Sequence, residues 1–143
     1  AQQWRSFSEM KRNNYNILIL SAGRRVELVD CFKRARERLK IKGSIIAADA
    51  SELAPALYFA DINEIVPRIS DNGRYIKAII NICRNFNVSL VIRTIDTELL
   101  LLSERRREIE ETGAKVLISD ERVTGICRDK KNTQKFLEEN GFV

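Results

Sequence analysis

The chain has 143 residues, of which 44% are hydrophobic and 31% charged, the balance expected of one soluble globular domain. Its formal net charge is +5, but basic residues are interspersed with acidic ones and no aromatic residues alternate with them, so nucleic-acid binding is disfavoured, and no apolar run approaches membrane-spanning length. Three widely spaced cysteines and the absence of histidine argue against a disulfide framework, a zinc site and histidine-based catalysis, and favour a reducing, cytoplasmic location.

Residues 1–15 are expected to form an N-terminal extension. Trp4, Phe7 and Met10 lie there among polar neighbours, without the apolar core of a signal peptide. The segment could be a short amphipathic helix or an extension unrelated to the fold.

Residues 16–29 predict a strand, a turn and a helix in immediate succession, which is how an α/β domain opens. Ile17 to Leu20 is wholly apolar, as in a parallel strand covered on both faces. Gly23 then permits a tight turn. From Val26 onward the apolar residues follow helical spacing, at Leu28, Phe32, Ala35 and Leu39.

The same alternation continues along the chain. Strands are expected at 44–49, 63–67, 88–92 and 115–118; a helix begins after Asp71, and others cover 98–112, 121–127 and 130–139, with a single helical turn within 51–60. Strands that alternate with helices pair in parallel through right-handed crossovers. We therefore predict a Rossmann-like, doubly wound α/β sheet of five strands in the order 3-2-1-4-5.

Ligands of such sheets bind at the carboxyl ends of the strands, where the strand order reverses. Three loops are predicted to meet there: Ser21–Arg25, Asp49–Ser51 and Arg93–Glu98. Arg24 and Arg25 start a helix, whose positive end already favours an anion. Together with the acids of the other loops, this mixed charge suits a zwitterionic substrate such as an amino acid.

Structural roles are open for the same residues. Arg24 and Arg25 could simply extend into solvent, and Asp49 and Asp96 could cap the segments that follow them. Glu98 would lie in the first helical turn, where the helix dipole favours an acid. Asp129 could cap the last helix. No nucleophile–base pair, metal-ligand cluster or glycine-rich phosphate loop is present, so neither catalytic residues nor metal ligands are predicted.

The complete order resembles the N-terminal, pre-ATP-grasp domain of ATP-grasp ligases, in the branch of carbamoyl-phosphate-synthase large-subunit-like proteins that includes the pyrrolysine-biosynthesis ligase. Four stretches carry the resemblance: residues 19–26 (ILSAGRRV), 47–61 (AADASELAPALYFAD), 93–99 (RTIDTEL) and 127–130 (CRDK). Relatives usually have proline where this chain has Arg93, a departure that bears on the shape of that loop.

The resemblance implies a ligase that joins a carboxylate to an amine through an acyl phosphate, using ATP and magnesium. Gly23, Arg24, Arg25, Thr94, Asp96 and Glu98 would face the substrate cleft, and Asp49, from its place at the end of the second strand, is expected to bind substrate beside them. Lys130 would match the lysine that reaches the ATP phosphates. Residues 16–128 would be the pre-ATP-grasp domain and 129–143 the start of the segment leading into an ATP-grasp module, which would be needed in cis; without it, neither ligation nor tight ATP binding is expected.

Two other functions are compatible with the sequence. One is a stand-alone Rossmann-type module that binds a nucleotide or another anion, with Gly23 and Asp49 in its site, although the second and third glycines of the dinucleotide motif are missing. The other is a dimerisation module that uses an exposed helix or sheet edge, a role that relatives often give this domain.

Overall fold

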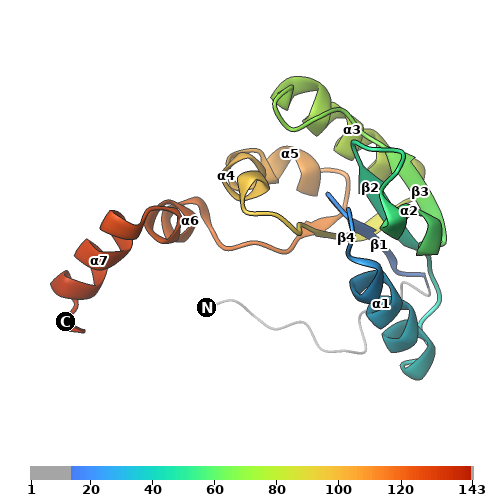
Figure 1. Ribbon diagram of the computed structural model, residues 1–143, viewed down its shortest axis with the longest axis horizontal. Coiled ribbons are helices and arrows are strands. Elements are labelled where there is room, and N and C mark those ends of the chain that lie inside the picture. The colour runs from blue at the N-terminus through green and yellow to red at the C-terminus, as the bar shows by residue number, and fades with distance from the viewer. Residues whose placement is uncertain (1–13, 143) are drawn as a thin grey trace.

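The computed structural model describes residues 14–142, so the predicted N-terminal extension lies almost wholly outside the described residues. Five parallel strands form one sheet in the order β3-β2-β1-β4-β5, as predicted (Figure 1). The strands are β1 (Asn16–Ile19), β2 (Ile45–Asp49), β3 (Ile62–Ile65), β4 (Val88–Ile92) and β5 (Lys115–Val116). The order reverses between β1 and β4, so a crevice is expected at their carboxyl ends.

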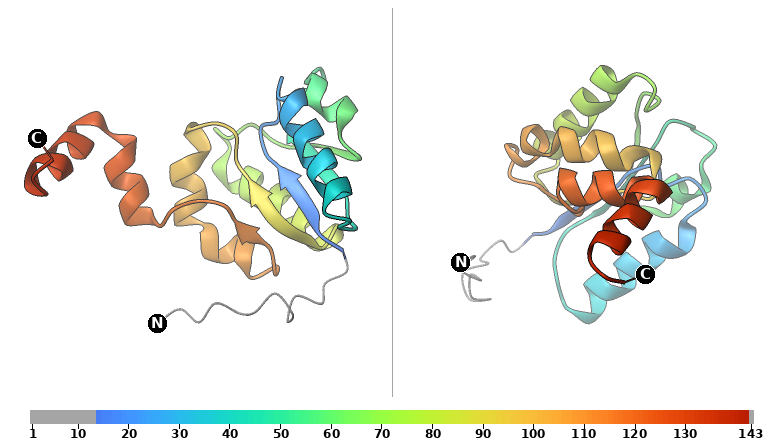
Figure 2. Two further views of the ribbon diagram at one scale, coloured as in Figure 1. Left: turned by 90° about the horizontal axis from the view of Figure 1, so that it is seen from below. Right: turned by 90° about the vertical axis from the view of Figure 1, so that its left-hand side faces the viewer.

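Helices cover both faces of the sheet (Figure 2). On one face, α1 (Val26–Arg38) and the short α2 (Pro55–Phe59) pack against side chains of β1 and β2. On the other, α3 (Asn72–Asn85), α4 (Thr97–Glu104) and α5 (Arg106–Glu110) enclose the larger core. Successive strand residues point to opposite faces, so Leu18 joins the larger core and Ile19 the smaller one, both fully buried.

The helix predicted at 98–112 is wrong as a single element. Arg105 leaves the helical conformation, with φ −102° and ψ 11°, and separates α4 from α5. Its guanidinium pairs with Glu108 in the next turn, which holds the restart of the helix in place. Strand β5 is also shorter than predicted: the Leu117 N–H still donates to the Val91 carbonyl at 2.9 Å, but the Ile118 N–H turns back to the Val116 carbonyl at 3.0 Å.

Asp61 and Gly43 fix the amino-terminal side of the sheet. The Asp61 carboxylate accepts hydrogen bonds from the Ile45 backbone N–H at 2.8 Å and from Arg36 at 2.6 Å, and Lys33 lies 3.4 Å away. Burial alone would raise the pKa of Asp61, but these partners together hold it below its ordinary value of 3.8. Gly43, at φ +137°, leaves no room for a side chain beside the backbone of Tyr15.

Beyond β5, α6 (Glu121–Arg128) and α7 (Lys130–Glu139) form an arm that extends from the body of the domain (Figure 1). Helix α6 packs against α4, whereas α7 contacts mainly α6 and contains no buried residue. Asp129 caps α7, as the structural alternative predicted, by accepting from the Lys131 N–H at 2.7 Å. Between residues 14 and 142, no helix is both long and apolar enough to span a bilayer.

Candidate functional site

A cleft of about 540 Å³ opens at the carboxyl end of the sheet. Its walls come from the turns after β1, β2 and β3, with Tyr75 of α3 and Ile95 of the β4–α4 loop completing it. Five of the residues predicted from the sequence lie along or directly beneath this cleft, and a sixth, Thr94, is hydrogen-bonded to its rim. The crevice predicted from strand order is therefore present.

The turn after β1 is held by backbone geometry that few residues tolerate. Ser21 and Gly23 both adopt positive φ, at 45° and 50°, and glycine does so without steric cost. The Ala22 N–H donates to the Ala48 carbonyl at 3.0 Å, which extends the β1–β2 pairing into the turn. The residues that start α1 are thereby brought to the mouth of the cleft.

Asp49 fixes two of the loops with one carboxylate. One oxygen accepts from the Gly23 N–H at 2.8 Å and the other from the Ser51 N–H at 2.9 Å. Asp49 thus caps the turn that leaves β2, which is one of the roles considered from the sequence, and also clamps the β1–α1 turn. Each oxygen still has a lone pair for a donor in the cleft.

Glu98 is fully buried beneath the cleft, although it begins a helix next to exposed residues. Its Oε1 accepts from the Ser21 hydroxyl at 2.6 Å and from the Tyr75 hydroxyl. Its Oε2 lies 3.4 Å from the Thr94 N–H, which points toward it. A buried carboxylate needs such donors, so Glu98 ties β1, α3 and the β4–α4 loop into one network.

Two further contacts place the β4–α4 loop beside the β1–α1 turn. The Thr94 hydroxyl donates to the Ser21 carbonyl at 2.6 Å, with the Leu20 carbonyl also within 3.0 Å. Arg25 donates from its guanidinium to the Thr94 carbonyl at 2.9 Å. The Gly-Arg-Arg turn and the Thr-Ile-Asp-Thr-Glu loop therefore share one rim.

The remaining predicted residues are placed differently. Arg24 is exposed and lines the cleft, and its side chain has no hydrogen-bond or ion-pair partner within residues 14–142. Asp96 is 98% exposed, lies 3.2 Å from Arg93 and is not part of the cleft lining. The alternative that Asp96 caps α4 is wrong, because its side chain makes no capping hydrogen bond. Its part in substrate binding stays a prediction.

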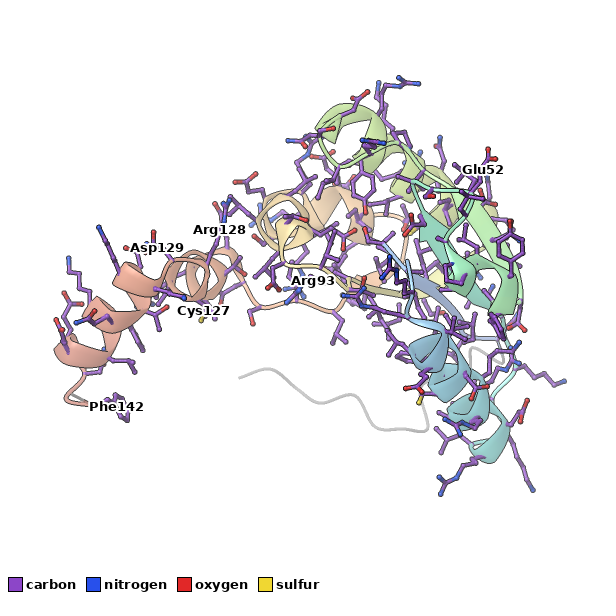
Figure 3. All side chains as sticks on the ribbon, viewed as in Figure 1. Glu52, Arg93, Cys127, Arg128, Asp129 and Phe142 are labelled. Atoms are coloured by element: carbon purple, nitrogen blue, oxygen red, sulfur yellow. The ribbon has the colours of Figure 1, made fainter. Side chains whose placement is uncertain are left out.

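Lys130 lies away from the cleft, as the first residue of α7. Its neighbour Asp129 is labelled on the arm in Figure 3, well separated from Arg93 at the end of β4. The Lys130 side chain is exposed. Whether it reaches ATP phosphates is untested by this arrangement and stays a prediction.

Two residues of the cleft escaped the sequence analysis. The sequence analysis did not single out Tyr75, and only the position of Glu98 shows why a tyrosine lies among the buried residues of α3. Arg68 follows β3, whose carboxyl end adjoins that of β2. Applying the carboxyl-end rule to the β3 loop as well would have identified it.

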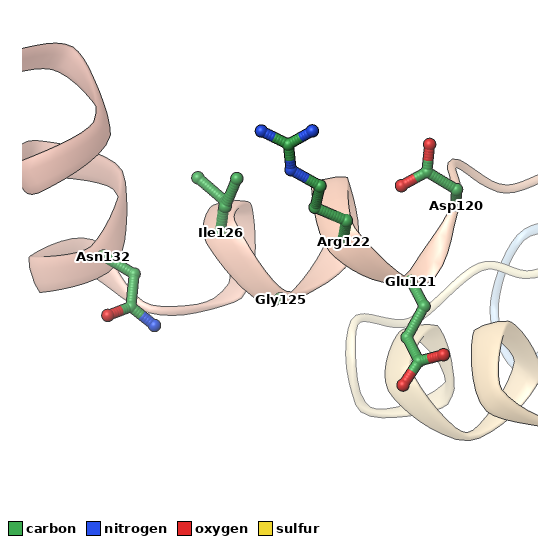
Figure 4. Close-up of a pocket in the computed structure, with 6 residues that line it drawn as sticks. All are labelled: Asp120, Glu121, Arg122, Gly125, Ile126 and Asn132. Carbon is green, nitrogen blue, oxygen red and sulfur yellow. The ribbon is translucent and has the colours of Figure 1, made fainter. Parts of the chain in front are cut away.

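Another hollow, of about 740 Å³, lies on the arm between α6 and α7. It is wide open, and its charged side chains do not converge on one point: Asp120 and Arg122 lie on one side of α6 and Glu121 on the opposite side (Figure 4). It is thus a weaker candidate than the cleft. In the part of the chain that the structure describes, no three cysteine and carboxylate side chains are grouped closely enough to hold a metal ion.

Comparison with known proteins agrees with this architecture. Residues 17–117 match the model of the PylC-like, N-terminal domain family. No curated protein sequence is significantly similar to the chain.

Several solved structures share the fold. The L-amino acid ligase from Bacillus licheniformis has a TM-score of 0.64 and 19% identity, covering 90% of this chain and 30% of that one. N5-carboxyaminoimidazole synthetase from Staphylococcus aureus, complexed with ADP, scores 0.56 at 17% identity, covering 89% and 30%. The biotin carboxylase domain of a single-chain bacterial carboxylase scores 0.58 at 16% identity, covering 89% and 29%. The chain thus spans less than a third of each of these proteins.

Proposed function

The chain belongs to the family of PylC-like N-terminal domains, the pre-ATP-grasp domains of ATP-grasp ligases, and we propose that it forms the substrate-side wall of an ATP-dependent carboxylate–amine ligase. An ATP-grasp module in cis would supply the opposite wall. The substrate is a small carboxylate or amino-acid-like molecule. The widely spaced free cysteines support a reducing, cytoplasmic setting.

The observation that carries this proposal is the shared rim of two loops. The Gly23–Arg25 turn presents cationic side chains and a helix N-terminus, and Asp49 presents a carboxylate between them and β3. Such a surface can hold the carboxylate and the ammonium of an amino acid at once. Glu98 is too deeply buried to meet substrate, and its part in the proposal is to position Ser21 and Thr94.

The described residues fit only a small part of an ATP–magnesium site. Lys130 is an exposed cation at the start of α7, followed by the exposed Lys131, and is suited to contact a phosphate oxygen from one side. When bound, ATP would activate a carboxylate by phosphorylating it. The chain's own residues would hold and orient the substrate on the opposite side of the crevice.

The test compares ATP–magnesium binding by this chain with binding by a version extended beyond Val143 into the following reading frame. We expect measurable affinity only in the extended protein, together with amino-acid-dependent phosphate release. In that protein, Arg24→Gln should weaken the apparent affinity for the amino-acid substrate, whereas the exposed control Arg38→Gln should not. Equally tight ATP binding by the short chain would contradict the proposal.

A second candidate function, self-association, is favoured by an apolar surface around α2 and the β3 edge. Leu53 and Tyr58 are 87% and 72% exposed there, with Phe59 and Ile65 about half exposed. β3 is hydrogen-bonded to β2 on one side and forms a sheet edge on the other. Sedimentation over a wide concentration range should reveal a dimer that Leu53→Asp disrupts; a wild-type chain that stays monomeric throughout would exclude this function.

A further inference from the structure

The cleft contains an arginine, Arg68, that neither the motifs nor the proposed function assigns. It lies in the turn between β3 and α3, directly after Pro67, on the far side of Asp49 from the β1–α1 turn. Like Arg24, it is exposed, lines the cleft and has no side-chain hydrogen bond or ion pair among residues 14–142. Arg36 and Arg105 have carboxylate partners, but other exposed arginines such as Arg38 have none among the described residues, so what distinguishes Arg68 is its place in the cleft lining.

The strand order explains how these two cations face one site. β2 lies between β1 and β3, so its end, with Asp49, lies between the turn that bears Arg24 and the turn that bears Arg68. The Asp49 carboxylate accepts from backbone N–H groups and forms no ion pair with either of these guanidiniums. Arg25 is already partly engaged by the Thr94 carbonyl.

The cleft lining therefore carries one carboxylate, Asp49, and three guanidiniums; Arg25 is held by the Thr94 carbonyl, whereas Arg24 and Arg68, on either side of Asp49, have no partner among the described residues. A ligand that matches these two partnerless cations and the carboxylate between them has two anionic groups and one ammonium. A simple monocarboxylic amino acid would leave one guanidinium without a partner, whereas a dicarboxylate without an ammonium would place its charges beside Asp49 with no compensating cation.

We propose that this cleft selects an acidic amino acid, with Arg68 and Arg24 each binding one carboxylate and Asp49 binding the ammonium. This inference rests on the proposed function. Arg68 is then a specificity-determining residue of the substrate-side wall. The carboxylate that Arg68 binds distinguishes an acidic amino acid from its amide.

A titration of the full chain tests this assignment. DL-glutamate, DL-glutamine and glutarate are each added at constant ionic strength, and binding is measured from the shifts of backbone amides in two-dimensional NMR spectra. We expect glutamate to bind about fivefold more tightly than glutamine or glutarate, the scale of one exposed ion pair. Arg68→Gln should abolish the preference for glutamate over glutamine. The matched control Arg74→Gln, which removes a charge from the exposed face of α3, should preserve it.

A preference for glutamate that persists in Arg68→Gln would overturn the assignment, as would equal binding of glutamate and glutamine by the wild type. No shift of the amides around Gly23 and Asp49 with any of the three ligands would overturn it too. These outcomes are separate from those of the ATP–magnesium comparison: a chain without acidic selectivity could still belong to a ligase that acts on neutral amino acids.

Discussion

Replacing Glu98 by alanine should destabilise the domain, because one carboxylate satisfies donors from three separate elements. The buried hydroxyl of Tyr75 and the hydroxyl of the half-buried Ser21 would both lose their acceptor. A buried donor without a partner costs about 1–3 kcal/mol, and charge-assisted hydrogen bonds are the stronger kind. We expect the free energy of unfolding to fall by about 3 kcal/mol.

Two milder variants separate the charge from the shape. Glu98→Gln keeps one oxygen for both hydroxyls but places its amide NH2 opposite the Thr94 N–H, so the charge assistance and that 3.4 Å contact are both lost, at a cost of about 1–2 kcal/mol. Tyr75→Phe removes one donor while Ser21 still occupies the same oxygen, at a cost of about 1–2 kcal/mol. Because the two side chains share one hydrogen bond, the double variant Glu98→Gln/Tyr75→Phe should lose less unfolding free energy than the two single variants lose in sum.

Urea unfolding at pH 7, with m-values compared among the variants, measures these differences. An alanine variant within about 1 kcal/mol of the wild type would refute the network as described.

The pH dependence provides a second check. Burial, and then the charge and hydrogen bond of Glu98, raise the pKa of Tyr75 above its ordinary value of 10.0. The folded state thus keeps a proton that the unfolded state loses, so stability should be complete below about pH 10 and decline above it. In Tyr75→Phe that decline should be smaller.

Three further predictions concern the rest of the domain. Gly43→Ala should lower the free energy of unfolding in urea by about 2–4 kcal/mol, because the new Cβ would overlap the Tyr15 backbone at a positive φ. The control Gly73→Ala has open space around it in α3 and should be neutral or stabilising by about 1 kcal/mol. Equal changes in unfolding free energy for the two variants would contradict the close approach of Gly43 to Tyr15. Asp61→Asn should lower the free energy of unfolding by about 1–2 kcal/mol at pH 7. Because the pKa of Asp61 is depressed in the folded state, the difference in unfolding free energy between variant and wild type should vanish as the pH falls below 3.8. A difference that stays constant down to pH 2 would be inconsistent with the ion pairs of Asp61. Burial raises the pKa of the Cys83 thiol to about 11, so iodoacetamide at pH 8 should modify the other two cysteines in the native protein and reach Cys83 only in urea, which mass spectrometry of the labelled chain would show.

The fold was predictable because its signals are local. Short apolar runs separated by helical spacing identify buried parallel strands, and the crossover rules then leave few possible orders for five of them. The carboxyl-end rule likewise brought Gly23, Asp49 and Thr94 to one edge before any contact was known.

What could not be predicted depends on distant partners. An acid in the first turn of a helix is normally explained by the helix dipole, and only the approach of Tyr75 and Ser21 shows why Glu98 is buried. The break between α4 and α5 at Arg105 could not be predicted, because no glycine or proline lies at that position. Arg68 was not predicted, because the three loops expected to meet follow β1, β2 and β4, whereas the cleft also includes the turn after β3.

Helix α7 has a consequence for how order is distributed in the molecule. A ten-residue helix that buries nothing gains little from the sheet, and helices of that length are marginal in water by themselves. Its persistence therefore rests on its own sequence, through the Asp129 cap and the pairs Gln134–Glu138 and Lys135–Glu139, and on α6, whose Ile126 carbonyl accepts from the Thr133 hydroxyl at 2.8 Å. The core gains little from whether these last turns are helical, so α7 can change partners without destabilising the sheet, while α6 stays packed against α4.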